Sequence, residues 1–410
     1  MIRWILFILI FGIIDFYAFQ AVKTIFRSRA VNLAYLLISL IVIGNLIYQI
    51  SSSGRGGLNT KMNFAIGFFL TLYIPKIVIM LMMFGEDILR VPQAMYQYFS
   101  TGGSSESTNY MPSRRVFVSK LALGIAAIPF VSFLYGMYHG RYNFKVLKYT
   151  LHFEDLPEAF DGYKITQISD LHIGSFDNKE KVEYAIDLIN EQASDALLFT
   201  GDMVNNRADE MLSWKDSFAK LNAKDGMYSI LGNHDYGDYV NWDSEELKTQ
   251  NLKNLEQVQK EIGFDLLRNE SRFIEKNGQR IAIVGVENWG KGFKQKGDLK
   301  KASEAIEAND FKILMSHDPS HWEYEVIDDD YHYHLTLSGH THGMQFGIEV
   351  PGWIKWSPVK WRYKYWAGIY EQKQQLINVN RGFGVLAYPG RVGIWPEITV
   401  IELKKGSKPA

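Results

Sequence analysis

Long apolar runs dominate the first third of the chain. They extend over residues 2–22, 31–50, 63–84 and 121–138. Each run is close to the ~20 residues that an α-helix needs to cross the hydrocarbon core of a bilayer. The pattern predicts a helical transmembrane bundle of about four spans over residues 1–141, with a polar linker at 98–112. A cleaved signal peptide is the alternative for the first run, but that run is long, lacks a small-residue cleavage site and is followed by further spans.

Two of these runs contain an ionisable residue, Asp15 in the first and Lys76 in the third. Charged side chains are costly in hydrocarbon and usually face the interior of a helix bundle. The sequence is consistent with an ion pair between Asp15 and Lys76. It is equally consistent with separate side chains that extend toward the membrane surface.

Arg114 and Arg115 precede the last apolar run. The distribution of Lys and Arg near the spans weakly favours a cytoplasmic position for this segment. The paired arginines, followed by Phe117 and Lys120, also resemble an internal twin-arginine export signal, with Lys120 one position late. An ordinary positive-inside anchor is the alternative, and both interpretations place everything after Tyr138 outside the cytoplasm.

From about Tyr142 onward the apolar pattern changes to short strands that alternate with amphipathic helices. Strands are expected at 163–168, 196–200, 227–231, 280–286, 311–316 and 335–338, and helices at 179–192, 211–221, 251–261 and 300–307. Later strands, which look antiparallel, are expected at 345–350, 375–379 and 397–403. This alternation is typical of an α/β domain, here with two sheets, over residues 142–410.

Composition narrows the chemistry that this second part can perform. The net charge of −1 gives no electrostatic reason to expect a nucleic-acid partner. The chain has no cysteine, which excludes disulfides, thiolate nucleophiles and cysteine-ligated metal sites. Any nitrogen ligands must therefore come from the ten histidines, and oxygen ligands from carboxylates or Asn.

Five polar clusters follow predicted strands, each at the point where the strand ends. They are Asp170-Leu171-His172, Gly201-Asp202, Gly232-Asn233-His234-Asp235, His317 and Gly339-His340-Thr341-His342-Gly343. Because the carboxyl ends of strands form the site edge of an open α/β sheet, these loops are expected to converge. In Asp-x-His and His-x-His the two residues share one face of an extended segment, so both can reach one metal centre. Each cluster alone is an ordinary turn or strand end, and the specificity lies in their combination and order.

The candidate metal ligands are carboxylates, one amide and imidazoles. They are Asp170, His172, Asp202, Asn233, His317, His340 and His342. This mixture suits Zn, Mn or Fe better than Mg or Ca, which prefer all-oxygen ligands. Seven ligands are too many for one ion, and if one carboxylate bridges they serve two. Two ions ~3.5–4 Å apart can clamp a phosphate and activate a bridging hydroxide for in-line attack.

The order of these motifs resembles that of the calcineurin-like metallophosphoesterases over about residues 163–403. The resemblance implies a two-sheet β sandwich flanked by helices. A first metal would be held by Asp170, His172, Asp202 and His342. A second metal would be held by Asp202, Asn233, His317 and His340, with Asp202 bridging. His234 would not bind metal, but would stabilise or protonate the leaving group.

Within that family the chain is similar to a bacterial branch with membrane-attached catalytic domains. The similarity lies in the tail, from Asn380 through Arg391 to residues 395–400. This branch includes proteins exported by the twin-arginine route and enzymes that cleave the pyrophosphate of a UDP-diacylglucosamine lipid precursor. It implies a bacterial cell-membrane location, an extracytoplasmic catalytic domain and a lipid-linked or cell-envelope substrate. Arg391 is a candidate to bind a phosphate oxygen bidentately, with a surface ion pair as the alternative.

A segment dense in Trp, Tyr, Lys and Arg follows the last cluster, at residues 352–366. Amphipathic rings beside cations suit the headgroup region of a membrane. One hypothesis is a lid that touches lipid headgroups or a lipid substrate. The other is aromatic packing under a long loop.

We therefore expect a multi-pass membrane enzyme that hydrolyses a phosphate ester or pyrophosphate with a metal-bridging hydroxide. A general phosphomonoesterase of soluble substrates is the alternative among enzymes. A cyclic-nucleotide phosphodiesterase is less favoured because no base-binding signature is visible. From another class, the alternative is a non-catalytic membrane receptor or scaffold, and the intact ligand set speaks against it.

Overall fold

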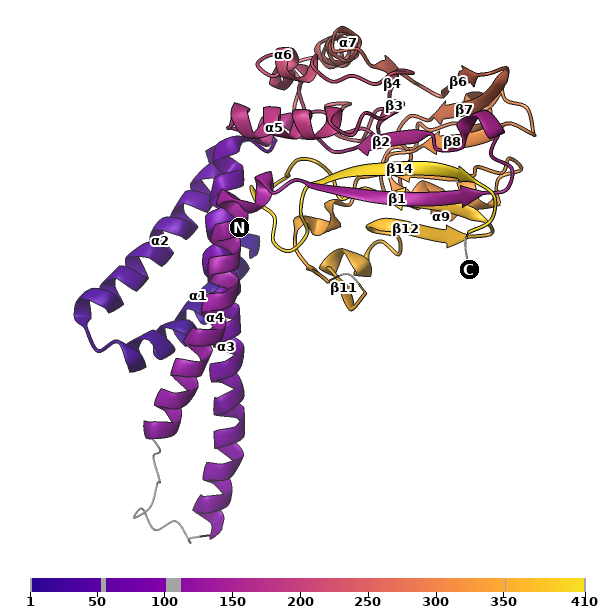
Figure 1. The fold of residues 1–410 in the computed structure, drawn as a ribbon. Helices are drawn as coiled ribbons and strands as arrows, with labels where there is room; N and C mark the ends of the chain where they lie inside the picture. The colour runs from indigo at the N-terminus through magenta and orange to yellow at the C-terminus, as the bar shows by residue number, and fades with distance from the viewer. Residues whose placement is uncertain (1, 53–56, 101–111, 351, 409–410) are drawn as a thin grey trace. The chain divides into compact units, whose positions relative to one another are not determined.

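The computed structural model describes residues 2–52, 57–100, 112–350 and 352–408 (Figure 1). The chain divides into two compact units. One unit comprises Met1–Ser52 and Phe64–Tyr135, and the other comprises Ser53–Asn63 and Gly136–Ala410.

Four long helices account for the apolar runs at the start of the chain. They are α1 (Ile2–Ile25), α2 (Arg29–Ser52), α3 (Thr60–Ser100) and α4 (Pro112–Tyr138) (Figure 1). Each contains a stretch long and apolar enough to cross a membrane, so the described residues contain four candidate spans, as many as predicted. Helices that expose apolar side chains such as Leu6, Leu9 and Ile13 are stable where lipid surrounds them. Because α3 runs to Ser100, residues 98–100 of the expected linker are helical, and its next part, 101–111, lies outside the described residues.

An ion pair lies inside the helical unit and joins three of its helices. Lys76 Nζ of α3 is 2.5 Å from Asp15 Oδ1 of α1 and 2.6 Å from Ser39 Oγ of α2. Tyr73 donates a hydrogen bond of 2.5 Å to the other oxygen of Asp15. Lys76 is only 2% exposed, and its ammonium also lies over the rings of Tyr35 and Tyr73. Of the two arrangements consistent with the sequence, the ion pair is therefore confirmed.

The first sheet of the second unit contains the earliest strands and the last one, in the order β1-β14-β2-β3-β4-β5. Their bounds are β1 (Lys145–Phe153), β14 (Glu397–Lys405), β2 (Lys164–Ile168), β3 (Ala196–Phe199), β4 (Met227–Ser229) and β5 (Asp265–Leu266). Strands β2 to β5 are parallel. Strand β14 pairs in parallel with β1 and antiparallel with β2, so it lies between them.

The second sheet has the order β12-β13-β9-β8-β7-β6. Its strands are β12 (Gly368–Gln372), β13 (Gln375–Val379), β9 (Leu335–Ser338), β8 (Phe311–Met315), β7 (Gln279–Gly285) and β6 (Glu270–Lys276). The four inner strands are parallel, and the two edge strands are antiparallel to their neighbours. A separate antiparallel hairpin consists of β10 (Ile348–Val350) and β11 (Ile354–Trp356).

The two sheets pack face to face and helices cover their outer faces. Ile313 and Met315 of β8 share one core cluster with Leu198 of β3, whereas Leu314 faces the opposite side, with Trp322. This period of two is the expected alternation of strand side chains. The first sheet is covered by α5 (Lys179–Asn190), α6 (Lys215–Phe218) and α7 (Glu245–Glu261). The second sheet is covered by α8 (Leu299–Ala302) and α9 (Pro319–Tyr324), which completes the expected sandwich flanked by helices.

The sequence prediction differs from this fold in three respects. Strands β1, β5, β6, β11 and β12 were not predicted; β1, for example, is an edge strand whose apolar alternation is interrupted by Lys145 and Lys148. The helices expected at 211–221 and 300–307 are single turns, α6 and α8. Strands β13 and β14, expected to be antiparallel, each have one parallel neighbour because they insert into existing parallel sheets.

Replacing Lys76 by Met removes the cationic partner of Asp15 and keeps an unbranched side chain. Removing one member of a buried ion pair typically costs about 3–5 kcal/mol because the other charge stays buried. The thermal midpoint of the full-length protein in detergent should therefore fall. Lys23→Met, at the exposed end of α1, should leave it unchanged. The double variant Asp15→Asn/Lys76→Met should recover much of the lost thermal stability. An unaltered thermal midpoint for Lys76→Met would show that the ion pair does not stabilise the helical unit.

Candidate metal centre

The side chains singled out in the sequence follow the carboxyl ends of five strands from both sheets. Asp170 and His172 follow β2, Asp202 follows β3, Asn233 and His234 follow β4, His317 follows β8, and His340 and His342 follow β9. Backbone hydrogen bonds join the loops, with Asp170 N donating to Gly201 O at 2.8 Å and Gly339 N donating to His317 O at 2.8 Å. The two sheets are linked here as well, because the amide of His340 donates to the Asp170 carboxylate at 2.9 Å. The predicted convergence of the loops is therefore present.

The histidines and carboxylates form three groups, within each of which the ligand atoms lie no more than 4.8 Å apart. The groups are Asp170–His172–His342, His172–Asp202–His234 and Asp202–His317–His340. Asp202 belongs to two of them, and its Oδ2 lies 3.2 Å from His317 Nε2 and 3.5 Å from His172 Nε2. A carboxylate in this position is suited to bridge two cations.

Several buried atoms of this cluster have no hydrogen-bond partner among the described residues. They are both ring nitrogens of His172, Nε2 of His342 and Oδ1 of Asn233. A buried polar atom without a partner costs ~1–3 kcal/mol, so such atoms require an explanation. A divalent cation would accept these lone pairs, and imidazole, amide and carboxylate are ligands that Zn, Mn and Fe accept. The donor set therefore fits a metal centre.

Hydrogen bonds to the far side of three imidazoles fix their orientation. His317 Nδ1 lies 2.7 Å from Thr200 O, and His234 Nδ1 lies 2.7 Å from Asn205 O. His340 Nε2 lies 2.8 Å from the hydroxyl of Tyr363, which leaves Nδ1 facing His317. A carbonyl on one nitrogen holds the proton there and leaves the other nitrogen available to a metal or substrate.

Asp235 ties the β3 and β4 loops together. Its carboxylate accepts hydrogen bonds from the backbone amides of Asp202, Met203, Val204 and Gly232, at 2.8–3.3 Å. Burial, together with the charge of Asp202, raises the pKa of Asp235 to about 7. From the sequence, Asp235 was expected to orient its neighbour or cap a turn, and Tyr363 was only one member of the aromatic segment at 352–366. Both position ligands of the candidate centre.

The candidate ligands occupy unusual backbone conformations. Positive φ angles between 43° and 69° occur at Asp170, His172, Asp202, His340 and His342. A non-glycine residue in this region costs on the order of 1–3 kcal/mol, and such strain concentrates at functional sites. Neighbouring glycines permit close approach, since a Cβ on Gly232 would lie 2.2 Å from Asp202 Oδ1.

The charges within the cluster compensate for its burial. Burial alone would raise the pKa of Asp202, but His317 and His234 outweigh it and hold this pKa well below its usual range. Burial would lower the pKa of His317, but Asp202 outweighs it and raises the pKa to about 10. The buried carboxylates thus attract positive charge, whether a proton or a cation.

Arg391 is fully buried, so it does not form a surface ion pair. Its Nε donates to Gly384 O at 3.0 Å, and its Nη2 donates to Gly382 O at 3.0 Å. Nη2 also lies 3.3 Å from His342 Nδ1. Burial lowers the pKa of Arg391 to about 9. Nη1 has no partner among the described residues and is the one group of this side chain left for a substrate.

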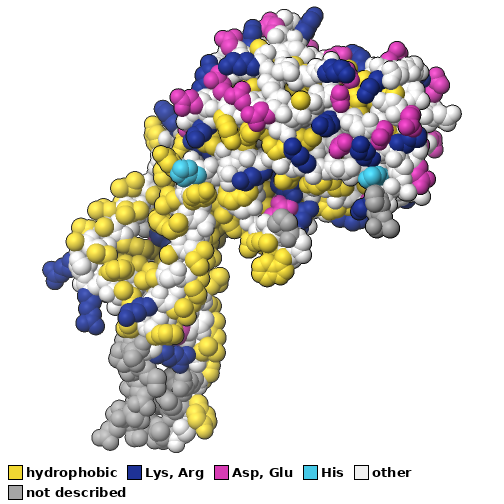
Figure 2. Space-filling model, viewed as in Figure 1, with side chains coloured by type: hydrophobic (Ala, Val, Ile, Leu, Met, Phe, Trp, Pro, Cys, Tyr) yellow, Lys and Arg dark blue, Asp and Glu magenta, His cyan; other side chains and the backbone are white. Residues whose placement is uncertain are grey.

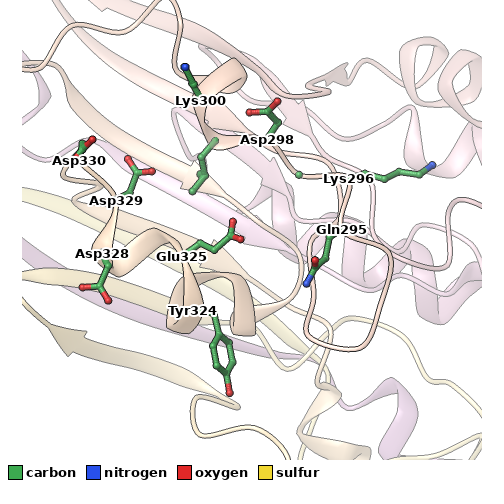
Figure 3. A pocket seen from close by; sticks show the side chains of 11 residues that line it. Gln295, Lys296, Asp298, Lys300, Tyr324, Glu325, Asp328, Asp329 and Asp330 are labelled. Carbon is green, nitrogen blue, oxygen red and sulfur yellow. The ribbon is translucent and has the colours of Figure 1, made fainter.

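Two cavities differ in their relation to the cluster. One of about 410 Å³ borders Asn233 and is lined also by Tyr239, Phe293 and Lys294. A larger one of about 740 Å³ has acidic residues along one wall, Glu325 and Asp328–Asp330 (Figure 3). None of the candidate ligands lines the larger cavity, whereas Asn233 lines the smaller one.

Comparisons with known proteins agree with this geometry. Residues 2–141 match the family described as "Probable Calcineurin-like phosphoesterase, transmembrane domain", and residues 163–344 match "Calcineurin-like phosphoesterase". The chain is 31% identical to "Uncharacterized metallophosphoesterase YkuE" of Bacillus subtilis, over 71% of this chain and 98% of that protein. It is 28% identical to "Phosphodiesterase YaeI" of Escherichia coli, over 72% of this chain and 100% of that protein.

A vertebrate relative also contains both types of region. The chain is 24% identical to "Transmembrane protein with metallophosphoesterase domain" of Danio rerio, over 70% of this chain and 62% of that protein. With its apolar helices and its α/β sandwich, the chain belongs to the calcineurin-like metallophosphoesterases, membrane-associated here, which hydrolyse phosphoester bonds.

Proposed function

We propose that this protein hydrolyses a phosphate ester or pyrophosphate at a dinuclear centre of Zn, Mn or Fe. The observation that carries the proposal is the position of the buried Asp202 carboxylate between the two sets of side chains, 3.2 Å from His317 Nε2 and 3.5 Å from His172 Nε2. When bound, two ions supply an activated water and the positive charge that in-line attack on phosphorus requires. Everything else is supplied by the side chains around them.

The ligands divide into two sets that share Asp202. Asp170, His172 and His342 belong to one ion, and Asn233, His317 and His340 belong to the other. The short distances from His342 Nε2 to Asp170 Oδ1, 3.2 Å, and from His340 Nδ1 to His317 Nε2, 3.3 Å, support this division. Asn233 Nδ2 donates to the hydroxyl of Tyr239 at 2.8 Å, which leaves its buried Oδ1 as the atom that could bind an ion.

His234 is the proposed acid for the leaving group. Asn205 O accepts the proton on Nδ1, so the imidazolium form would present its second proton, on Nε2, to the leaving group. Its ring lies 4.8 Å from that of His172, beside the centre, and it is only partly buried. Arg391 Nη1 is the proposed contact to a phosphate oxygen. Its fixed guanidinium would hold that oxygen without losing side-chain entropy.

A lipid-linked or cell-envelope substrate is the proposed class, with the catalytic domain (142–410) outside the cytoplasm and the transmembrane domain (1–141) in a bacterial cell membrane. The membrane spans and the positive charge at Arg114 and Arg115 support this orientation. The name of the Escherichia coli relative favours a phosphodiester bond. A general phosphomonoesterase of soluble substrates is the alternative, and a receptor or scaffold is the alternative outside enzymes.

Asp202→Asn tests the bridging position. The substitution keeps the shape of the side chain but removes the negative charge that both ions share, so bound metal should fall from about two ions per chain to less than one. Elemental analysis of the purified full-length protein after Zn or Mn loading measures it. Asp216→Asn, at an exposed position, is the matched control and should bind as the wild type does. Undiminished binding by Asp202→Asn would refute a bridge, and a wild type without metal would favour the receptor or scaffold.

His234→Ala tests the acid. It should lower kcat by about 10²–10⁴-fold on bis(p-nitrophenyl) phosphate and leave the metal content unchanged, because the residue acts on the leaving group. His332→Ala, at an exposed position, should keep the wild-type rate. A full rate in the His234 variant would contradict the proposed role.

Orientation can be read from single cysteines because the chain has none of its own. Leu212→Cys, in the catalytic unit and 65% exposed, should react with a membrane-impermeant maleimide on intact cells. Ser107→Cys, in the expected cytoplasmic linker, should react only after the membrane is permeabilised. The opposite pattern would place the catalytic unit in the cytoplasm.

A further inference from the structure

An exposed apolar patch lies on the β10–β11 hairpin and the turn that follows it. We call residues 344–350 and 352–364 the aromatic hairpin. Its exposed apolar side chains are Met344, Ile348, Val350, Trp353, Ile354 and Trp361. Trp353 and Trp361 are 85% and 75% exposed, whereas tryptophan is normally mostly buried. Figure 2 shows hydrophobic side chains gathered where Figure 1 labels β11.

The exposure of this patch does not come from a loose loop. A small core of Val359, Tyr363, Trp366, Ala367 and Ile394 packs beneath the hairpin. Ser357 Oγ donates to Gly343 O at 2.8 Å, and Thr341 Oγ1 donates to Trp366 O at 2.7 Å. Aromatic packing therefore explains the buried rings of the segment. It does not explain the exposure of Trp353 or of Trp361, whose ring has an edge-to-face contact with Trp356 at a centroid distance of 6.1 Å.

Cations accompany the patch. They are Lys355, Lys360, Arg362 and Lys364. The only acidic residue in the aromatic hairpin is Glu349, and it is engaged by Arg381, whose Nη2 lies 2.5 Å and Nε 2.9 Å from its two carboxylate oxygens. The hairpin thus combines exposed indole rings with a net positive charge.

We propose that the aromatic hairpin docks on the surface of an anionic lipid bilayer. Trp at headgroup depth, flanked by Lys and Arg that attract anionic lipids, is the composition of a membrane-interface anchor. A bilayer is also within reach by covalent connection, because α4 ends at Tyr138 and β1 begins at Lys145. A second copy of this chain is a poorer partner for the same surface, since it would bring its own four cations against these four.

The aromatic hairpin is connected to the candidate metal centre by hydrogen bonds. The hydroxyl of Tyr363, at the end of the aromatic hairpin, lies 2.8 Å from His340 Nε2 and 3.3 Å from Asp318 Oδ2. Tyr363, buried in the small core beneath the exposed patch, therefore links the aromatic hairpin to a proposed metal ligand. The inference does not depend on the identity of the substrate, because it concerns where the catalytic unit rests.

Trp353→Cys in the full-length, otherwise cysteine-free chain provides the test. The substituted side chain is almost fully exposed, so the fold should be retained. A polarity-sensitive fluorophore at this position, in nanodiscs of phosphatidylcholine with equal phosphatidylglycerol, should emit at shorter wavelength. It should be quenched several-fold more by doxyl-labelled lipid than by iodide. Pure phosphatidylcholine, or Lys360→Glu/Lys364→Glu, should weaken this difference because the anionic attraction is reduced.

Leu212→Cys and Leu247→Cys, exposed apolar positions elsewhere on the same unit, are the matched controls and should be quenched by iodide instead. Quenching at position 353 that equals these controls would overturn the proposal. Protection that appears only in nanodiscs holding two chains would also overturn it, and would assign the surface to a second copy.

Discussion

Negative charge buried away from water must be met by positive charge, and this requirement governs the centre of the catalytic unit. Asp202 is 1% exposed, and isolated burial of a carboxylate would cost several kcal/mol. Imidazoles from three other loops approach it, and the amide of His234 donates to its Oδ1 at 2.8 Å. Strained backbone at Asp170 and His342, and glycines where a Cβ would collide, follow from the need to bring these loops so close. The same crowding creates the ligand geometry that a cation needs.

The helical unit obeys the same requirement with different groups. Asp15 is met by Lys76, and the remaining polar atoms of both side chains are occupied by Tyr73 and Ser39. Hydrocarbon offers no water to solvate an unpaired charge. The ion pair between Asp15 and Lys76 therefore specifies how α1, α2 and α3 pack together. Arg115 of α4 adds a further link within this unit, with its Nη1 at 2.9 Å from Glu86 and 2.6 Å from Asp87 of α3. These helices are apolar on nearly every face, so polar interactions, rather than buried apolar area, determine which faces pack together.

Short-range pattern was sufficient to predict the four long apolar helices, α5, α7, most inner strands and the loops that carry the candidate ligands. A buried strand such as β8 is continuously apolar, and Gly-Asn-His-Asp after β4 is unmistakable as a loop. What escaped prediction depends on distant partners. Strand β1 is defined by its pairing with β14. Asp235 stabilises the β3 loop by accepting hydrogen bonds from its backbone amides, such as that of Met203. Arg391 is buried because its guanidinium donates to glycine carbonyls, such as Gly382 O. The spacing of residues in the sequence also carries no information on backbone φ angles. The left-handed backbone conformation of the candidate ligands could therefore not be predicted.

The position of β14 determines when the first sheet of the catalytic unit can be completed. This strand is translated after every other strand of the catalytic unit, yet it occupies an inner place between β1 and β2. Until residues 397–405 have left the ribosome, β1 has no neighbour in the sheet, and the groove between the first two strands is open to water or chaperones. The four apolar helices, by contrast, can enter the bilayer hundreds of residues earlier in the chain. Completion of the first sheet thus depends on pairing between segments far apart in sequence, and contacts of this kind generally form more slowly than local ones.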